Sequence, residues 1–190
     1  MEFHLFEDQI IEYKDLSASP LLKGTYDHCQ FSHCDFSETD FSSFRFIECI
    51  FKDCNLSLAK VQQTAFRDVR FVDCKMLGLH FNTANALGFE IYCEKSILNN
   101  CVFYGWNLKK TVFRECLLKE VDFAKCDLTL AIFDQCDLLD ALFEETKLEK
   151  ADFRTAFNYS IDPENNLLKK AKFSLPAVTG LLHRYNIIIE

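Results

Sequence analysis

Residues 98–153 read LNNCVFYGWNLKKTVFRECLLKEVDFAKCDLTLAIFDQCDLLDALFEETKLEKADF, and every fifth residue in this segment is a leucine or a phenylalanine. A period of five fits neither the 3.6-residue period of an α-helix nor the two-residue period of a strand. Self-similarity at a fixed short period indicates a repeat architecture. The two residue types alternate without exception at Leu98, Phe103, Leu108, Phe113, Leu118, Phe123, Leu128, Phe133, Leu138, Phe143, Leu148 and Phe153.

The position two residues before each of these central residues is small or of medium size, with Trp106 as the exception. Four five-residue units would form one square coil of twenty residues, in which the central residue and the small residue point inward. Successive coils would then stack about 4.8 Å apart, the usual spacing of paired strands. The sequence therefore predicts an all-β fold, a right-handed quadrilateral β-helix, with a core of about six turns.

The alternation also predicts how the core is filled. Phe103, Phe123 and Phe143 fall on one side of the coil, and the phenylalanines of the intervening units fall on the opposite side. Leucines occupy the two sides between them. Each layer would contain two rings and two aliphatic side chains, which is a constant volume and suits a close-packed core.

Several units match a known repeat. Ala-Asp-Phe at 151–153, Cys-Asp-Leu at 126–128 and 136–138, and Cys-Asp-Phe at 34–36 resemble the A(D/N)LXX unit of pentapeptide-repeat proteins. The resemblance covers about three quarters of the chain. It implies the β-helix fold, whereas fold alone does not determine activity.

The C-terminal part resembles one branch of that family more closely. The segments 86–91 (ALGFEI), 161–164 (IDPE) and 180–187 (GLLHRYNI) resemble quinolone-resistance (Qnr) and microcin-immunity proteins. This resemblance implies an acidic rod that dimerises through a C-terminal helix, imitates duplex DNA and protects DNA gyrase and topoisomerase IV from inhibitors. The long projecting loops of the larger Qnr proteins have no counterpart here.

The repeat changes phase once. Upstream, the central positions run from Tyr26 to Phe81, and Leu98 belongs to a register shifted by two residues. We therefore expect two inserted residues within 82–97. We assign residues 1–157 to the β-helix, with 1–23 as an N-terminal cap, and residues 158–190 to a C-terminal cap and dimerisation tail. In that tail we expect a helix over Leu175–Tyr185 and a short strand at Ile187–Ile189.

The ten cysteines do not predict disulfides or a metal site. Nine occupy the inward position two residues before a central residue, where cysteine serves as a small hydrophobe. No Cys-x-x-Cys motif occurs, and the cysteine and histidine spacings do not suit zinc. With no secretory signal pattern, we expect reduced thiols and a cytoplasmic protein. The nine are Cys29, Cys34, Cys49, Cys54, Cys74, Cys101, Cys116, Cys126 and Cys136.

Neither catalysis nor a cofactor is predicted. The five histidines are scattered, and no glycine-rich phosphate loop occurs. The net charge of −8 argues against nonspecific affinity for nucleic acid, because phosphate binding requires a lysine- or arginine-rich surface. Basic residues such as Arg67, Arg70 and Lys110 interrupt the acids at outward positions, so no face is purely negative.

Two functions remain open, a DNA-mimicking partner of a topoisomerase and a scaffold for another protein. A continuous negative stripe would favour mimicry, and a mixed surface with an apolar patch would favour a scaffold. Trp106 either fills space at the phase break or anchors a partner. The candidate partner surface comprises Trp106, Ile97, Leu117 and Ile132, and the candidate homodimer interface comprises Leu181, Leu182, Tyr185, Ile187 and Ile188.

Overall fold

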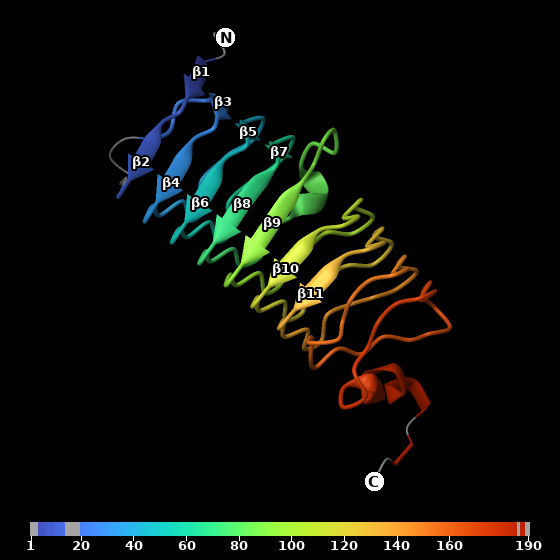
Figure 1. The fold of residues 1–190 in the computed structure, drawn as a ribbon. Coiled ribbons are helices and arrows are strands. Elements are labelled where there is room, and N and C mark those ends of the chain that lie inside the picture. Colours follow the sequence, from blue (N-terminus) through green and yellow to red (C-terminus); the bar gives the residue numbers. More distant parts are fainter. Residues whose placement is uncertain (1–3, 14–19, 186, 189–190) are drawn as a thin grey trace.

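The computed structural model describes residues 4–13, 20–185 and 187–188, and it is an elongated parallel β-solenoid (Figure 1). Residues twenty apart pair in register, as Tyr26 with Phe46 and Phe31 with Phe51. The predicted right-handed quadrilateral β-helix is confirmed. The described strands are β1 (His4–Glu7), β2 (Ile10–Glu12), β3 (Gly24–Asp27), β4 (Gln30–Ser32), β5 (Arg45–Ile47), β6 (Ile50–Lys52), β7 (Ala65–Arg67), β8 (Val69–Val72), β9 (Ile91–Glu94), β10 (Val112–Arg114) and β11 (Ile132–Asp134).

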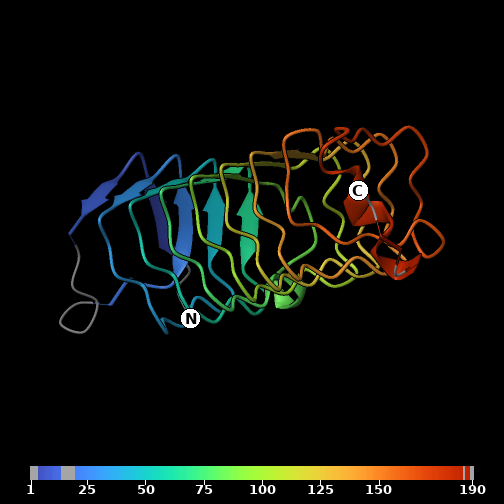
Figure 2. The ribbon, with the colours of Figure 1, turned by 90° about the horizontal axis from the view of Figure 1, so that it is seen from below.

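The strands form two parallel sheets on adjacent sides of the rod. One has the order β1-β3-β5-β7, and the other has the order β2-β4-β6-β8-β9-β10-β11. The remaining sides are joined by single bridges such as Ile97 with Leu117 and Val102 with Asp122. Figure 2 shows the coils following one another along the rod, from the blue N-terminal strands to the red C-terminal segment.

Ring stacking confirms the predicted filling of the core. Phe103 and Phe123 stack with their centroids 5.5 Å apart, and Phe113 and Phe133 stack at 5.4 Å on the opposite side. Central residues are buried from Tyr26 to Phe153, which is about six turns. The preceding coil, with Phe6 and Ile11, is only partly buried and covers the open end.

Each coil turns its corners through residues in the left-handed backbone region. The second residue after the central one has this conformation, with φ of 61° at Lys110, 63° at Leu130 and 58° at Lys150. Its backbone N–H donates to the next coil, as Lys110 N does to Thr129 O at 3.0 Å. This hydrogen bond offsets part of the cost of the left-handed conformation, which is about 1–2 kcal/mol for a residue with a side chain.

All ten cysteines are buried thiols. Besides filling space, eight of the thiols donate to carbonyl oxygens of the preceding coil, as Cys126 Sγ does to Phe103 O at 3.0 Å. Thr146 Oγ1 makes the equivalent bond to Phe123 O at 3.0 Å. Cysteine and threonine at the inward position therefore supply a hydrogen bond that size alone did not predict, whereas Ala131 and Ala151 fill the same position without one.

The coil pairing extends beyond the boundary that we expected at residue 157. Asp152 pairs with Lys172, and Phe153 stacks on Phe173 at 5.3 Å. After this coil, the expected short helix takes the form of two 3-10 helices, η2 (Val178–Leu181) and η3 (His183–Tyr185). A third, η1 (Phe81–Thr83), lies at the phase break.

The backbone around Gly180 explains why one continuous α-helix does not form. Gly180 O accepts a hydrogen bond from Ile161 N at 3.0 Å, so this carbonyl is bonded to the end of the rod rather than within a helix. A Cβ at Gly180 would lie 2.3 Å from Tyr159 O, so this close packing requires glycine. The strand expected at Ile187–Ile189 is absent from its described residues, Ile187 and Ile188, and Ile189 lies outside them.

Candidate functional site

The phase break is confined to residues 86–90. Ala65 pairs with Asn85, twenty residues on, whereas Val69 pairs with Ile91, twenty-two residues on. Ile91 then occupies the inward column where other coils have small residues. Cys93 occupies the column where the neighbouring coils have Phe71 and Phe113. The large and small side chains have exchanged places, which keeps the volume of the layer nearly constant.

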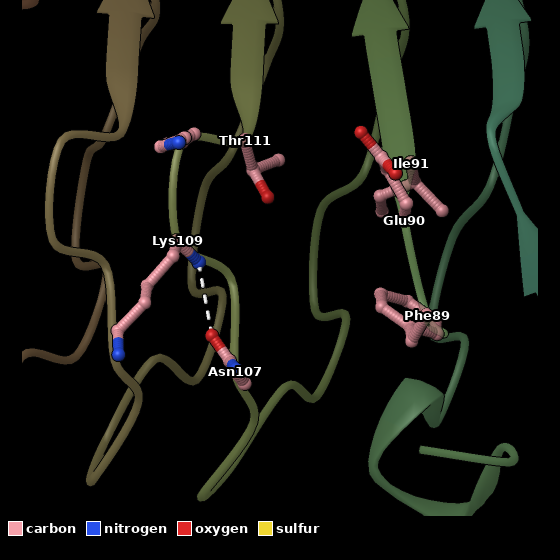
Figure 3. Close-up of a pocket in the computed structure, with 7 residues that line it drawn as sticks. Phe89, Glu90, Ile91, Asn107, Lys109 and Thr111 are labelled. Carbon is pink, nitrogen blue, oxygen red and sulfur yellow. Dashed lines mark hydrogen bonds between the residues drawn. The ribbon is translucent and has the colours of Figure 1, made fainter. Parts of the chain in front are cut away.

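A cavity of about 240 Å³ opens where the inserted residues separate two coils. Figure 3 shows Phe89, Glu90 and Ile91 on one coil and Asn107, Lys109 and Thr111 on the next. Lys109 N donates to Asn107 Oδ1 at 3.3 Å, and the Lys109 ammonium pairs with Asp127 at 3.3 Å. The cavity lining offers no nucleophile beside a base, so this geometry suggests no catalytic reaction.

Trp106 fills space beside this cavity. Its ring meets Phe89 edge to face, with centroids 5.4 Å apart, and it packs partly buried against the core. The buried indole N–H has no hydrogen-bond partner among the described residues. This placement agrees with the space-filling alternative rather than with an exposed anchor.

The four residues proposed as a partner surface do not form one patch. Ile97 and Leu117 are stacked neighbours, but Ile132 stacks over Val112 on another side of the rod. Trp106 lies nine residues, about half a coil, after Ile97, so it is on the opposite side. Four other apolar side chains near the C-terminal end of the rod are each between 38% and 47% exposed, Leu117, Leu139, Leu142 and Phe157. Leu117 and Phe157 share a column with Asp137 between them, and Leu142 belongs to the column of the next side.

Charge is distributed unequally along the rod. Residues 1–90 contain 14 acidic and 8 basic residues, net −6, whereas residues 91–190 contain 15 and 13, net −2. In the first half, carboxylates bracket the strands of the larger sheet. Glu48 precedes β6 and Asp53 follows it, while Asp68 precedes β8 and Asp73 follows it. We call these four residues the acidic stripe.

One corner column changes sign at the phase break. Its left-handed residues are Asp8, His28, Glu48 and Asp68 before the break, then Gly88, and afterwards Lys110, Leu130, Lys150 and Lys170. Beyond the break, carboxylates form ion pairs with lysine or arginine. Lys109 and Lys147 flank Asp127, at 3.3 and 3.8 Å, and Arg154 holds Asp152 at 2.8 Å. The Arg154 hydrogen bond lowers the pKa of Asp152.

Two histidines contact carboxylates in the first half. His28 contacts Asp27 at 2.7 Å through Nδ1 and Glu48 at 2.9 Å through Nε2. The hydrogen bond to Asp27 and the nearby Glu48 charge raise the pKa of His28 above its ordinary value of 6.5. His33 lies 3.9 Å from Asp53. The charge of the stripe region therefore depends on pH near neutrality.

The residues proposed for a dimer interface divide into two groups. Leu181 packs against the core, and Leu182 is half-buried. Tyr185, Ile187 and Ile188 are exposed, Ile188 to 89%. Leu175, which the predicted helix would have turned toward the core, is also 89% exposed. The tail is held by Arg184, which contacts Asp162 at 2.6 Å and Glu164 at 3.0 Å.

The described residues contain no group of three histidine, cysteine, aspartate or glutamate side chains that could hold a metal ion. Within the same ranges, no helix has the length and apolarity needed to cross a membrane.

The chain is similar to solved structures, and the similarity to HetL supports the fold. One structure of QnrB1, a plasmid-mediated fluoroquinolone resistance protein, is 20% identical, with 99% of this chain and 98% of that chain covered and a TM-score of 0.46. HetL, a pentapeptide-repeat protein involved in heterocyst differentiation regulation in the cyanobacterium Nostoc, is 13% identical, with coverages of 90% and 84% and a TM-score of 0.50. No curated protein sequence matches this chain.

The family assignment comes from the sequence model of the pentapeptide repeat region, which matches residues 25–91 and 89–153. These ranges include more than half of the chain and end at the last phenylalanine of the unbroken repeat, Phe153. The protein belongs to the pentapeptide-repeat family.

Proposed function

We propose that this protein acts without catalysis, as a cytoplasmic rod whose acidic stripe occupies the DNA-binding surface of DNA gyrase or topoisomerase IV. The observation that carries this proposal is the pair of carboxylate rows on either side of β6 and β8. The resemblance of the C-terminal segments to Qnr and microcin-immunity proteins supplies the class of partner. The ten reduced thiols fit a reducing compartment.

The geometry of the rows supports mimicry of a duplex. The two acids that bracket a strand are five residues apart, at most about 16 Å in extended backbone, and successive coils are about 4.8 Å apart. Duplex DNA places phosphate rows on both sides of a major groove about 12 Å wide. Lys52 and Arg70 lie on the strands between the rows, so the match is to two separated rows rather than to a uniformly negative face.

The test is a gyrase supercoiling assay with a quinolone, in which the protein is titrated for protection. The variant Glu48→Gln/Asp53→Asn/Asp68→Asn/Asp73→Asn removes the stripe. We expect it to need at least about tenfold more protein for protection, which corresponds to about 1.4 kcal/mol. The control Glu115→Gln/Asp140→Asn/Glu144→Gln/Glu149→Gln removes the same charge from the second half and should protect normally. Equal protection by both variants would reject the acidic stripe as the surface that binds gyrase.

A second function, a scaffold for a protein partner, is favoured by the exposed side chains of Leu117, Leu139, Leu142 and Phe157, which we propose act together as an apolar patch. Apolar side chains at the centre of an interface contribute most of its binding energy. The variant Leu142→Glu/Phe157→Glu distinguishes the two functions. If it abolishes protection while the stripe variant retains it, the apolar patch is the binding surface.

We also propose a homodimer through the tail, because Leu175, Tyr185, Ile187 and Ile188 leave apolar area uncovered at the end of the rod. Two-fold pairing of identical patches would cover it and form a closed assembly. Sedimentation velocity should show twice the 22.1 kDa chain mass for wild type and the single mass for Leu175→Glu/Ile188→Glu. Ile10→Glu, at the opposite end, is the control and should remain dimeric. A monomeric wild type at micromolar concentration would end this proposal.

A further inference from the structure

The corner column that is acidic in the first half carries lysine in the second. Lys110, Lys150 and Lys170 occupy this column, and Lys169 immediately precedes Lys170. All four are exposed, and none makes an ion pair with another described residue. We call these four residues the lysine ridge. Lys150 N donates to Lys169 O at 3.0 Å, which places the last three on adjacent coils.

The surroundings of the ridge are also basic. Lys109 and Lys147 flank Asp127, and Lys172 lies 3.6 Å from Asp152. The acids of this region are Glu90, Asp127, Glu149 and Asp152, so the seven lysines exceed them by three. The two aspartates each contact a lysine already, whereas the ridge ammonium groups remain available to an external anion.

We propose that the lysine ridge binds the phosphate backbone of duplex nucleic acid. From Lys110 to Lys170 the column spans three coil steps, about 14 Å. One strand of duplex DNA has a phosphate every 3.4 Å of axis, so about four phosphates fit along the ridge. Lysine is a compact point charge that contacts phosphate without reading sequence, so binding should be sequence-independent.

The composition of the ridge favours nucleic acid over an acidic protein. Lysine is depleted in protein interfaces, where aromatic residues and arginine supply the anchors. The ridge contains neither, and Leu130 is its one interposed apolar side chain.

The net charge of −8 does not oppose local binding at this end of the rod. Glu48 in the acidic stripe is five coil steps from Lys150, about 24 Å at the strand spacing, whereas Asp68 is two coil steps from Lys110, about 10 Å. The Debye length at physiological salt is about 8 Å, so the stripe is largely screened from Lys150, Lys169 and Lys170, and less so from Lys110. The expectation of no nucleic-acid binding rested on the net charge of the whole chain. That net charge is an average over two halves whose local charges differ.

The experiment measures fluorescence anisotropy of a labelled duplex of about 20 base pairs. Wild type should bind at about 50 mM salt and lose about 100-fold in affinity by about 200 mM, because about four phosphate contacts give a slope near −3.6 in log–log form. Lys110→Gln/Lys150→Gln/Lys169→Gln/Lys170→Gln should abolish binding. The control Lys52→Gln/Lys60→Gln/Lys75→Gln/Lys95→Gln removes the same charge elsewhere and should bind as wild type.

Three results would overturn the proposal. The first is a wild type that does not bind at low salt, and the second is a ridge variant that binds as wild type. The third is polyglutamate that competes as well as DNA at equal charge, which would assign the ridge to an acidic protein surface. Circular dichroism verifies that the variants fold. Each single lysine substitution should reduce the salt slope by about 1.

Discussion

The two halves of the rod fill the same coil in different ways. Before the phase break, rings occupy most central positions, and Phe46 contacts six aromatic rings. After it, phenylalanine alternates with leucine, and Phe123 contacts four rings. The surfaces differ as well, since carboxylates dominate the first half and ion pairs the second. The comparison shows that the coil restricts inward size while leaving the outward charge free to vary.

The largest effect should come from placing a charged side chain in the core of the second half. Ala131 is fully buried, so Ala131→Asp would place a carboxylate in the core without a partner, a cost of several kcal/mol or more. We expect no soluble folded protein. Gln135→Asp, at an exposed corner of the same coil, should fold normally. Equal melting temperatures for the two would contradict the inward and outward assignment.

Replacing one buried phenylalanine with alanine in each half compares the two cores directly. Phe123→Ala should cost about 3–5 kcal/mol in urea unfolding, as buried aromatic truncations do. Phe46→Ala should cost more, because each aromatic pair adds roughly 0.5–1.5 kcal/mol beyond area burial. A Phe46→Ala cost below that of Phe123→Ala would show that ring contacts do not distinguish the halves, and a Phe123→Ala cost below about 1 kcal/mol would refute its burial.

The C-terminal end should be sensitive to one methyl group. Gly180→Ala would place Cβ 2.3 Å from Tyr159 O, and the resulting overpacking should cost about 1–3 kcal/mol. Gly105→Ala, where nothing lies within 4 Å of the added Cβ, tests the left-handed backbone alone and should cost less. Hydrogen exchange of residues 175–185 should increase in the first variant only.

The smallest effect concerns pH in the first half. A raised folded-state pKa means that His28 stabilises the fold below the unfolded value of 6.5 and loses this contribution as the pH rises through the folded value. His28→Gln should therefore lower the melting temperature more at about pH 5.5 than at about pH 8.5. A difference of the opposite sign would contradict the contacts with Asp27 and Glu48.

The repeat was predictable from sequence because position modulo five separates inward from outward residues from Tyr26 to Phe81 and again, shifted by two residues, from Leu98 to Phe153. The site of the insertion was not. Phe89, Ile91 and Cys93 are all apolar, so several placements of two extra residues satisfy the pattern. The exchange between Ile91 and Cys93 depends on the volume of the stacked layers, which a single coil does not reveal.

The candidate surfaces were less predictable than the fold. Apolar residues at outward positions were recognisable, but which of them adjoin depends on stacking between coils, as for Leu117 beside Ile97. The tail resembled a helix because its apolar residues have helical spacing. Tyr159 and Ile161, which draw Gly180 onto the end of the rod, are distant in sequence and not part of that pattern.

The claim that the acidic first half binds the partner is tested most directly by hydrogen exchange of the full chain with and without purified DNA gyrase. Protection is expected at residues 45–73, which include the acidic stripe, with little change at 115–157. Protection confined to Leu117, Leu139, Leu142 and Phe157, with the stripe exchanging freely, would contradict the account and assign binding to the apolar patch.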